Sequence, residues 1–90
     1  MGQIDYVKHS LVLKALSHPV RLKILEVLFD NEFCVNDLSN TLNLPQAISS
    51  HHLGIMKNSG ILHSHKQGAR AYYSVKNDLA KGIISILRKN

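Results

Sequence analysis

The stretch over residues 44–60 constrains the fold most, because its apolar and polar side chains separate onto two sides when it is read at the period of an α-helix. One side can be buried in a core and carries Ser49, Leu53 and Met56. The other side carries small or uncharged polar residues, namely Ala47, Ser50, His51 and Gly54, with Gln46 beside them at the helix start. No carboxylate occurs between residues 45 and 57. The stretch therefore predicts a helix with one buried side and one short, uncharged, hydrogen-bonding side.

The outer side of this helix has two interpretations. Short side chains let a helix approach the edges of base pairs in a DNA major groove, where Gln, Ser and His have matching donors and acceptors. The same small polar residues also occur on ordinary solvated helices. The remaining chain favours the first interpretation, that of a DNA-reading helix.

The residues before this stretch predict a second short helix, joined to it by a tight turn. This helix is expected from Cys34 or Val35 to Leu42, with Cys34 at the cap and Asp37 in the first turn, where a carboxylate favours the positive end of the helix. The turn is formed by residues 43–45. Two short helices joined in this way make a helix-turn-helix.

The other elements are three helices and a hairpin. Helices are expected over residues 4–16, 19–30 and 78–89, the second with His18 or Ser17 at the cap and Pro19 at its first position. After Gly60 the period changes to 2, which predicts strands over 61–66 and 70–75 around a three-residue loop. The fold class is therefore mainly α with a small β-hairpin, a winged helix-turn-helix in a single domain over residues 1–90.

The first and last helices carry more apolar residues than one buried face needs. In the first, one stripe consists of Ile4, Val7, Leu11 and Ala15, widened by Val12, Leu13 and Leu16. In the last, the apolar residues are Leu79, Ala80, Ile83, Ile84, Ile86 and Leu87. A helix that is apolar on more than one side has a second surface to cover. We expect these two helices to pack together across a twofold homodimer.

The net charge of +5 is unevenly distributed along the chain. Residues 1–42 carry five acids against four bases (−1), whereas residues 43–90 carry one acid against seven bases (+6). The basic half contains the candidate DNA-reading helix and the cations Lys57, Lys66 and Arg70. A polyanion is the natural partner of such a half, although a solvated basic face is the alternative.

The order of elements and their residues resembles the ArsR/SmtB family of bacterial winged helix-turn-helix repressors over nearly the whole chain. The segments that carry the resemblance are residues 15–25, 33–38, 44–53 continuing to 57–62, and 66–75. The resemblance implies a homodimer that binds an inverted-repeat operator in double-stranded DNA near a promoter, usually as a repressor released by a chemical signal.

The resemblance also assigns DNA-binding residues. The family's base-reading positions correspond to Gln46, Ala47, Ser50 and His51, and its wing cations to Lys66 and Arg70. Ala47 departs from the polar residue often found at its position, which puts one base contact in doubt. His52 is expected to pack against the core.

The family's metal ligands are mostly missing, so no metal site and no cofactor are expected. The thiolate pair written Cys-Val-Cys-Asp-Leu in its members is here Cys34-Val35-Asn36-Asp37-Leu38, with one thiolate. Residues 79–90 contain no Asp, Glu, His or Cys. His63 and His65 share a strand face and form either a weak pair of ligands or exposed histidines. Cys34 is the candidate redox residue, and the alternative is a buried cap without chemistry.

Composition excludes several other classes of protein. One cysteine rules out an internal disulfide and fits a reducing cytoplasm. No stretch approaches the ~20 apolar residues of a membrane span, so a cytoplasmic protein without a membrane partner is expected. The chain offers no Ser-His-acid arrangement and no phosphate-binding glycine loop, so an enzyme is not expected. A winged-helix module that binds a protein instead of DNA remains the alternative, disfavoured by the acid-free, basic segment over residues 38–77.

Overall fold

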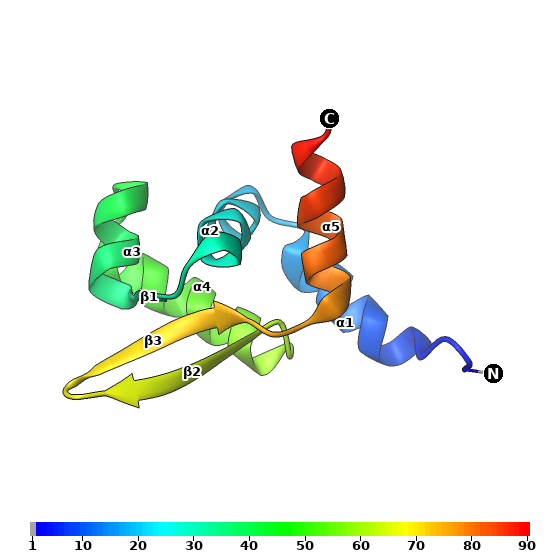
Figure 1. The fold of residues 1–90 in the computed structure, drawn as a ribbon, viewed down its shortest axis with the longest axis horizontal. Coiled ribbons are helices and arrows are strands. Elements are labelled where there is room, and N and C mark those ends of the chain that lie inside the picture. Colours follow the sequence, from blue (N-terminus) through cyan, green and yellow to red (C-terminus); the bar gives the residue numbers. More distant parts are fainter. Residues whose placement is uncertain (1) are drawn as a thin grey trace.

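The computed structural model describes residues 2–90, which form five helices and a three-stranded sheet (Figure 1). The elements are α1 (Tyr6–Leu16), α2 (Pro19–Asp30), β1 (Phe33–Cys34), α3 (Val35–Leu42), α4 (Gln46–Asn58), β2 (Leu62–Gln67), β3 (Arg70–Val75) and α5 (Asp78–Arg88). The mainly helical winged helix-turn-helix fold expected from the sequence is confirmed.

Side-chain caps explain where the helices begin. His18 is the cap of α2, since its Nδ1 accepts a hydrogen bond from the backbone N–H of Val20 at 3.1 Å, and Pro19 occupies the first helical position, as expected. The helix α1 begins at Tyr6 rather than at Ile4, because the carboxylate of Asp5 accepts from the backbone N–H of Lys8 at 3.0 Å and makes Asp5 the cap. The expected start at residue 4 was therefore wrong by two residues.

The sheet contains one strand that the sequence did not predict. The strand β1 pairs antiparallel with β3, with Phe33 opposite Tyr73 and Cys34 opposite Tyr72, in the strand order β1-β3-β2. Two residues are too few for a period of 2 to show in the sequence. The pairing fixes the start of α3 against the middle of β3.

The hairpin of β2 and β3, called the wing below, closes with a tighter turn than expected. Gln67 pairs with Arg70, so the loop consists of Gly68 and Ala69 alone, and the expected three-residue loop was wrong. Gly68 has φ +66°, whereas Ala69 keeps a negative φ, as in the two-residue turns that begin with glycine. The wing projects away from the helices, as Figure 1 shows.

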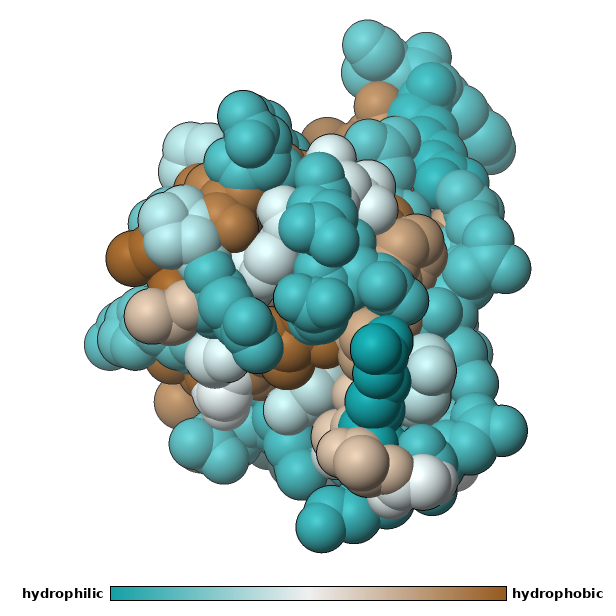
Figure 2. Space-filling model, turned by 90° about the vertical axis from the view of Figure 1, so that its left-hand side faces the viewer, coloured by the Kyte–Doolittle hydropathy of each residue, from teal (hydrophilic) through white to brown (hydrophobic). Residues whose placement is uncertain are grey.

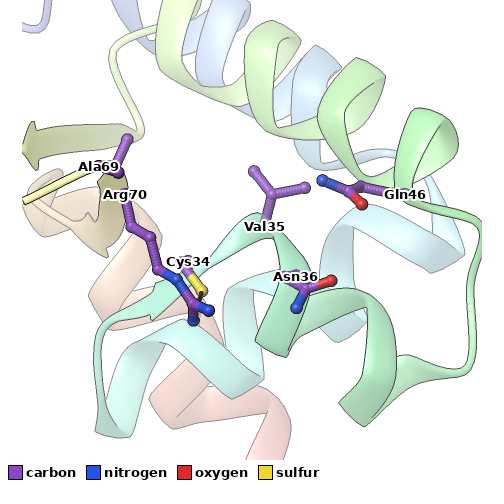
Figure 3. A pocket seen from close by; sticks show the side chains of 7 residues that line it. Cys34, Val35, Asn36, Gln46, Ala69 and Arg70 are labelled. Atoms are coloured by element: carbon purple, nitrogen blue, oxygen red, sulfur yellow. Dashed lines mark hydrogen bonds between the residues drawn. The ribbon is translucent and has the colours of Figure 1, made fainter.

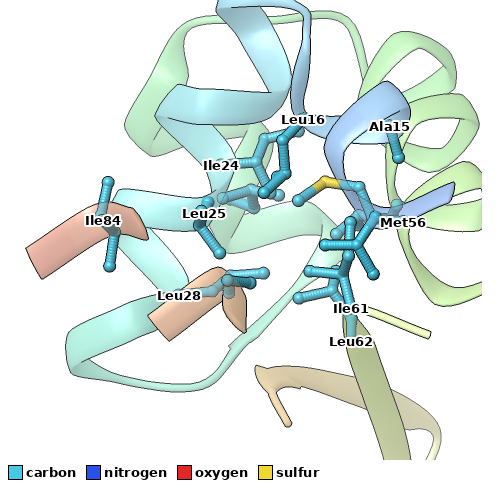
Figure 4. Close-up of a cluster of buried hydrophobic side chains, with 13 residues drawn as sticks. Ala15, Leu16, Ile24, Leu25, Leu28, Met56, Ile61, Leu62 and Ile84 are labelled. Atoms are coloured by element: carbon cyan, nitrogen blue, oxygen red, sulfur yellow. The ribbon is translucent and has the colours of Figure 1, made fainter. Parts of the chain in front are cut away.

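The core lies around α2 and gathers apolar side chains from all the helices and from β2 (Figure 4). Its fully buried aliphatic residues include Ile24, Leu25, Leu38, Leu53, Ile61 and Leu62. Truncating one of these to alanine is expected to cost about 2–5 kcal/mol. The predicted inward residues of α4, Ser49, Leu53 and Met56, are all buried, which confirms the orientation of that helix.

Large apolar side chains remain exposed on α1, on the residues before it and on α5. They are Ile4, Tyr6, Val7, Leu11, Leu13, Ile86 and Leu87. The expected stripe is not a single face, because Ala15 is buried whereas Ile4, Val7 and Leu11 are exposed. Ile83 is also half-buried against the core rather than free. In Figure 1 both helices lie at the end of the molecule opposite the tip of the wing.

The helix α5 is attached to α2 by Arg88. Its Nη2 donates to the carboxylate of Asp30 at 2.7 Å, its Nε lies 3.4 Å from a carboxylate oxygen of Glu26, and its guanidinium lies over the ring of Phe29. This hydrogen bond to Arg88 lowers the pKa of Asp30. Among residues 2–90, no helix is long and apolar enough to cross a membrane.

Candidate nucleic-acid interface

The helix α4 presents its uncharged side to solvent, as the sequence predicted. Its exposed residues include Gln46, Ala47, Ser50 and His51, whereas Gly54 is half-buried. The preceding residue, Pro45, occupies the cap position without a side-chain hydrogen bond. The backbone N–H of Ile48 donates to the carbonyl of Pro45 at 3.0 Å, so the N–H groups of Gln46 and Ala47 remain available to an acceptor such as a phosphate oxygen. The geometry places hydrogen-bonding side chains and a helix N-terminus on one exposed surface.

Two interactions hold α4 against α3. Asn43 adopts the left-handed conformation, with φ 54°, and the backbone N–H of Leu44 donates to the carbonyl of Ser39 at 3.0 Å, which closes the turn. The hydroxyl of Ser39 also donates to the hydroxyl of Ser49 at 2.8 Å, and both serines are buried. The helical period predicts that Ser49 is buried, but it gives no sign of the hydrogen bond to Ser39, which lies in the preceding helix.

Arg21 and His52 join α4 to the first two helices. The Nε of Arg21 donates to His52 Nδ1 at 3.2 Å, and its Nη1 donates to the carbonyl of Ala15 at 3.1 Å. His52 is buried, as expected for a packing residue. Its burial lowers its pKa below the ordinary value, and the nearby His18 and Arg21 lower it further. The contact of Arg21 with His52 of α4 was not expected from the sequence, since the two residues are 31 positions apart.

The three expected cations occupy different environments. Lys57 lies on α4 and its Nζ donates to the Ser64 hydroxyl at 2.9 Å, which ties the helix to the wing. Lys66 is exposed near the wing tip. Arg70 is exposed as well, but its Nη1 donates to the sulfur of Cys34 at 3.7 Å, and this contact raises the pKa of Arg70. Its guanidinium therefore lies beside the start of α3 rather than extending from the wing.

A pocket of about 340 Å³ lies where α3, α4 and the wing meet (Figure 3). It is lined by Cys34, Val35, Asn36, Gln46, Ala69 and Arg70, among others. The structure thus brings the candidate base-reading Gln46 and the wing cation Arg70 to the rim of one hollow. Cys34 stands at the cap position of α3, as expected, but it is buried and its thiol makes no capping hydrogen bond.

The two histidines of the wing, His63 and His65, do not form a metal centre with their described neighbours. The Nε2 of His65 lies 3.6 Å from a carboxylate oxygen of Glu32, and its ring stacks on Tyr72. His63 pairs across the hairpin with Ser74. Within the described residues 2–90, no group of three or more His, Cys, Asp or Glu side chains is arranged to hold a metal ion.

Figure 2 shows the face of the molecule that contains α3 and the tip of the wing. This face is mainly hydrophilic, with smaller hydrophobic areas between the polar side chains. In contrast, the exposed apolar residues named above lie on or near α1 and α5. Most of the exposed apolar surface is therefore carried by elements other than those of the polar, cation-bearing surface, with the exception of Ile48 on α4, which is 43% exposed.

Comparison with known proteins places this arrangement in a family. The family described as "Bacterial regulatory protein, arsR family" matches residues 18–64. Over 83 residues the chain is 37% identical to MJ1325 of Methanocaldococcus jannaschii, named an uncharacterized HTH-type transcriptional regulator, with 91% of this chain and 93% of that protein covered. It is 43% identical to the cadmium resistance regulatory protein CadC of Listeria innocua over 86% of this chain but only 66% of CadC.

A solved structure agrees with these sequence relatives. The crystal structure of the transcriptional repressor PagR of Bacillus anthracis superposes with a TM-score of 0.85 at 35% identity, covering 91% of this chain and 94% of PagR. The family match, the relatives and the fold all point to regulators of transcription and not to enzymes. The chain belongs to the ArsR family of bacterial regulatory proteins and is a winged helix-turn-helix transcriptional regulator.

Proposed function

We propose that this protein is a homodimeric repressor that binds an inverted-repeat operator in the cytoplasm and reads its bases with α4. The observation that carries the proposal is the exposed, carboxylate-free outer side of α4, whose opposite side is fixed in the core. A helix with short polar side chains fits the major groove closely enough for hydrogen bonds to base edges.

The roles of the outward residues follow from their chemistry. The amide of Gln46 can donate to and accept from adenine, and the Ser50 hydroxyl and His51 imidazole can each pair with a base edge. Ala47 has no polar group, but its methyl can contact the methyl of a thymine. These four residues are proposed to set the operator sequence.

The cations near α4 are proposed to contact phosphates. Lys57 and Lys66 supply charges on the helix and on the wing. Arg70 joins them by turning away from the sulfur of Cys34, a weak acceptor at 3.7 Å, so that leaving it costs little. Each neutralised phosphate releases counterions, which makes binding fall with salt.

Dimerisation is proposed to occur through α1 and α5, whose apolar side chains are exposed in the single chain. An inverted repeat presents two half-sites about one DNA turn apart, and reading both requires two α4 helices held at a matching distance. A twofold contact between rigid helices provides that spacing.

The proposal is tested by selecting DNA from a random library with the full chain. The selected sequences are expected to contain an inverted repeat, and ultracentrifugation is expected to show one dimer per site. Binding to the selected DNA should exceed binding to shuffled DNA by about 10³-fold or more at physiological salt. Selection of no common sequence would contradict base reading, and a monomer bound to a single half-site would contradict the dimer.

A further inference from the structure

The buried His52 of α4 contacts three other nitrogen-bearing side chains, of which His51 is exposed on the outer side of the same helix. The ring of His52 lies with its centroid 4.8 Å from that of His18 and 5.4 Å from that of His51. The Nε of Arg21 donates to His52 Nδ1 at 3.2 Å. A ring nitrogen that accepts this bond must be unprotonated, so the geometry requires a neutral His52 with its proton on Nε2.

Arg21 is held from the other side by α1. Its Nη1 donates to the carbonyl of Ala15 at 3.1 Å, one of the carbonyls that an α-helix leaves free in its last turn. The guanidinium therefore bridges the end of α1 and the middle of α4. His52, the residue that the guanidinium contacts on α4, directly follows His51, which is proposed to read bases.

The charged and titratable groups that face His52 all favour its neutral form. They are His18 and Arg21 from α2 and His51 from α4 itself, and Lys14 of α1 lines the same hollow as Arg21. None of these groups is a carboxylate. Burial and the three neighbouring groups lower the pKa of His52 from its ordinary value of 6.5.

We propose that Arg21 is a positioning residue for DNA binding. Its hydrogen bond to His52 fixes the orientation of α4 only while His52 is neutral. Acidification therefore releases α4 from Arg21 and removes operator specificity. The inference rests on the proposed base reading by α4 and adds a residue and a regulation to it. Protonation turns Nδ1 from an acceptor into a donor that faces the N–H of Arg21, and it adds a positive charge to a site without a negative one.

The sign of the effect follows from linkage. A histidine whose pKa is lowered in the positioned state stabilises that state above the ordinary value of 6.5, and the contribution is lost as the pH falls from 6.5 toward the lowered pKa. Each pH unit in that window changes the equilibrium between the positioned and the released state of α4 by up to about tenfold.

The test measures the ratio of operator to shuffled-DNA affinity between pH 7.5 and pH 5.5 at constant salt. In the parent the ratio is expected to fall, by up to about tenfold, while affinity for shuffled DNA is kept. A ratio independent of pH would overturn the inference without touching the proposed function. Absence of operator preference at pH 7.5 would instead contradict the proposed function itself.

Three variants assign the effect to His52. In His52→Asn the amide oxygen can accept from Arg21 without titrating, so its ratio is expected to be independent of pH. In His18→Asn, which keeps a capping side chain at the start of α2, and in His51→Asn, the fall is expected to persist. Loss of the fall in His18→Asn alone would overturn the inference.

Two further measurements keep the test independent of folding defects. Nitrogen-15 NMR of the parent histidines at pH 7.5 is expected to show His52 protonated on Nε2 only, and a proton on Nδ1 would contradict the geometry. Arg21→Met, which removes the guanidinium but leaves an unbranched side chain at residue 21, is expected to lower operator specificity at pH 7.5 and to flatten its pH profile. A parent-like, pH-dependent ratio in Arg21→Met would show that Arg21 has no positioning role.

Discussion

The buried hydroxyl pair between α3 and α4 makes a strong prediction about the stability of the helix-turn-helix. The Ser39 hydroxyl donates to the Ser49 hydroxyl at 2.8 Å, and Ser49 is completely buried. Replacing either serine with alanine leaves the other hydroxyl buried beside a methyl group, without its partner. Replacing both removes the two polar groups together.

The expected magnitudes differ for the single and the double variants. An orphaned buried hydroxyl costs about 1–3 kcal/mol, so Ser39→Ala and Ser49→Ala should each destabilise the fold by that amount. The double variant orphans no group and should lose less than the sum of the two single variants, by roughly 1 kcal/mol or more. For a chain of this length each kcal/mol corresponds to a Tm shift of about 4–8 °C.

Urea and thermal unfolding of the four proteins, followed by circular dichroism at one protein concentration, give the double-mutant cycle. The concentration must be fixed because the unfolding of a dimer depends on it. Strict additivity of the two single variants would refute the reasoning, since it would mean that the two hydroxyls do not depend on each other.

The remaining predictions concern the wing, the dimer and the chemical signal. Lys66→Ala should weaken binding to all DNA and reduce the salt slope by about one unit, and an unchanged slope would remove the wing from the interface. Ile86→Glu, at a position 60% exposed, should give monomers in ultracentrifugation, whereas a dimer as stable as the parent's would place the contact elsewhere. Zinc, cadmium and arsenite should shift operator affinity by less than the 1–3 kcal/mol typical of allosteric effectors. Any change in operator affinity caused by peroxide should vanish in Cys34→Ser. A change that survives in this variant would exclude the Cys34 thiol as the redox sensor.

The features predicted correctly from the sequence are those encoded locally. The two sides of α4 follow from the spacing of Ser49, Leu53 and Met56, and the start of α2 follows from His18 and Pro19. The wing follows from the change of period after Gly60. Each of these signals lies within one or two helical turns or one hairpin.

The features that were missed depend on residues far apart in the sequence. Arg21 and His52 are 31 residues apart and Arg70 and Cys34 are 36 apart, so no local pattern relates them. The strand β1 is too short to show a period and forms only because β3 lies beside it. Ile83 belongs to the apolar pattern of the last helix, but the pattern alone does not show that this residue packs against the core and not on the free surface.

The central claim, that the outer side of α4 reads bases, is tested most directly by Ser50→Ala and His51→Ala. Affinity for the selected operator and for shuffled DNA is measured for each variant by fluorescence anisotropy at one salt concentration and at pH 7.5. The account predicts a loss of about 1–3 kcal/mol on the operator for each variant, with nearly unchanged affinity for shuffled DNA. Parent-like affinities on both DNAs, or equal losses on both, would contradict it.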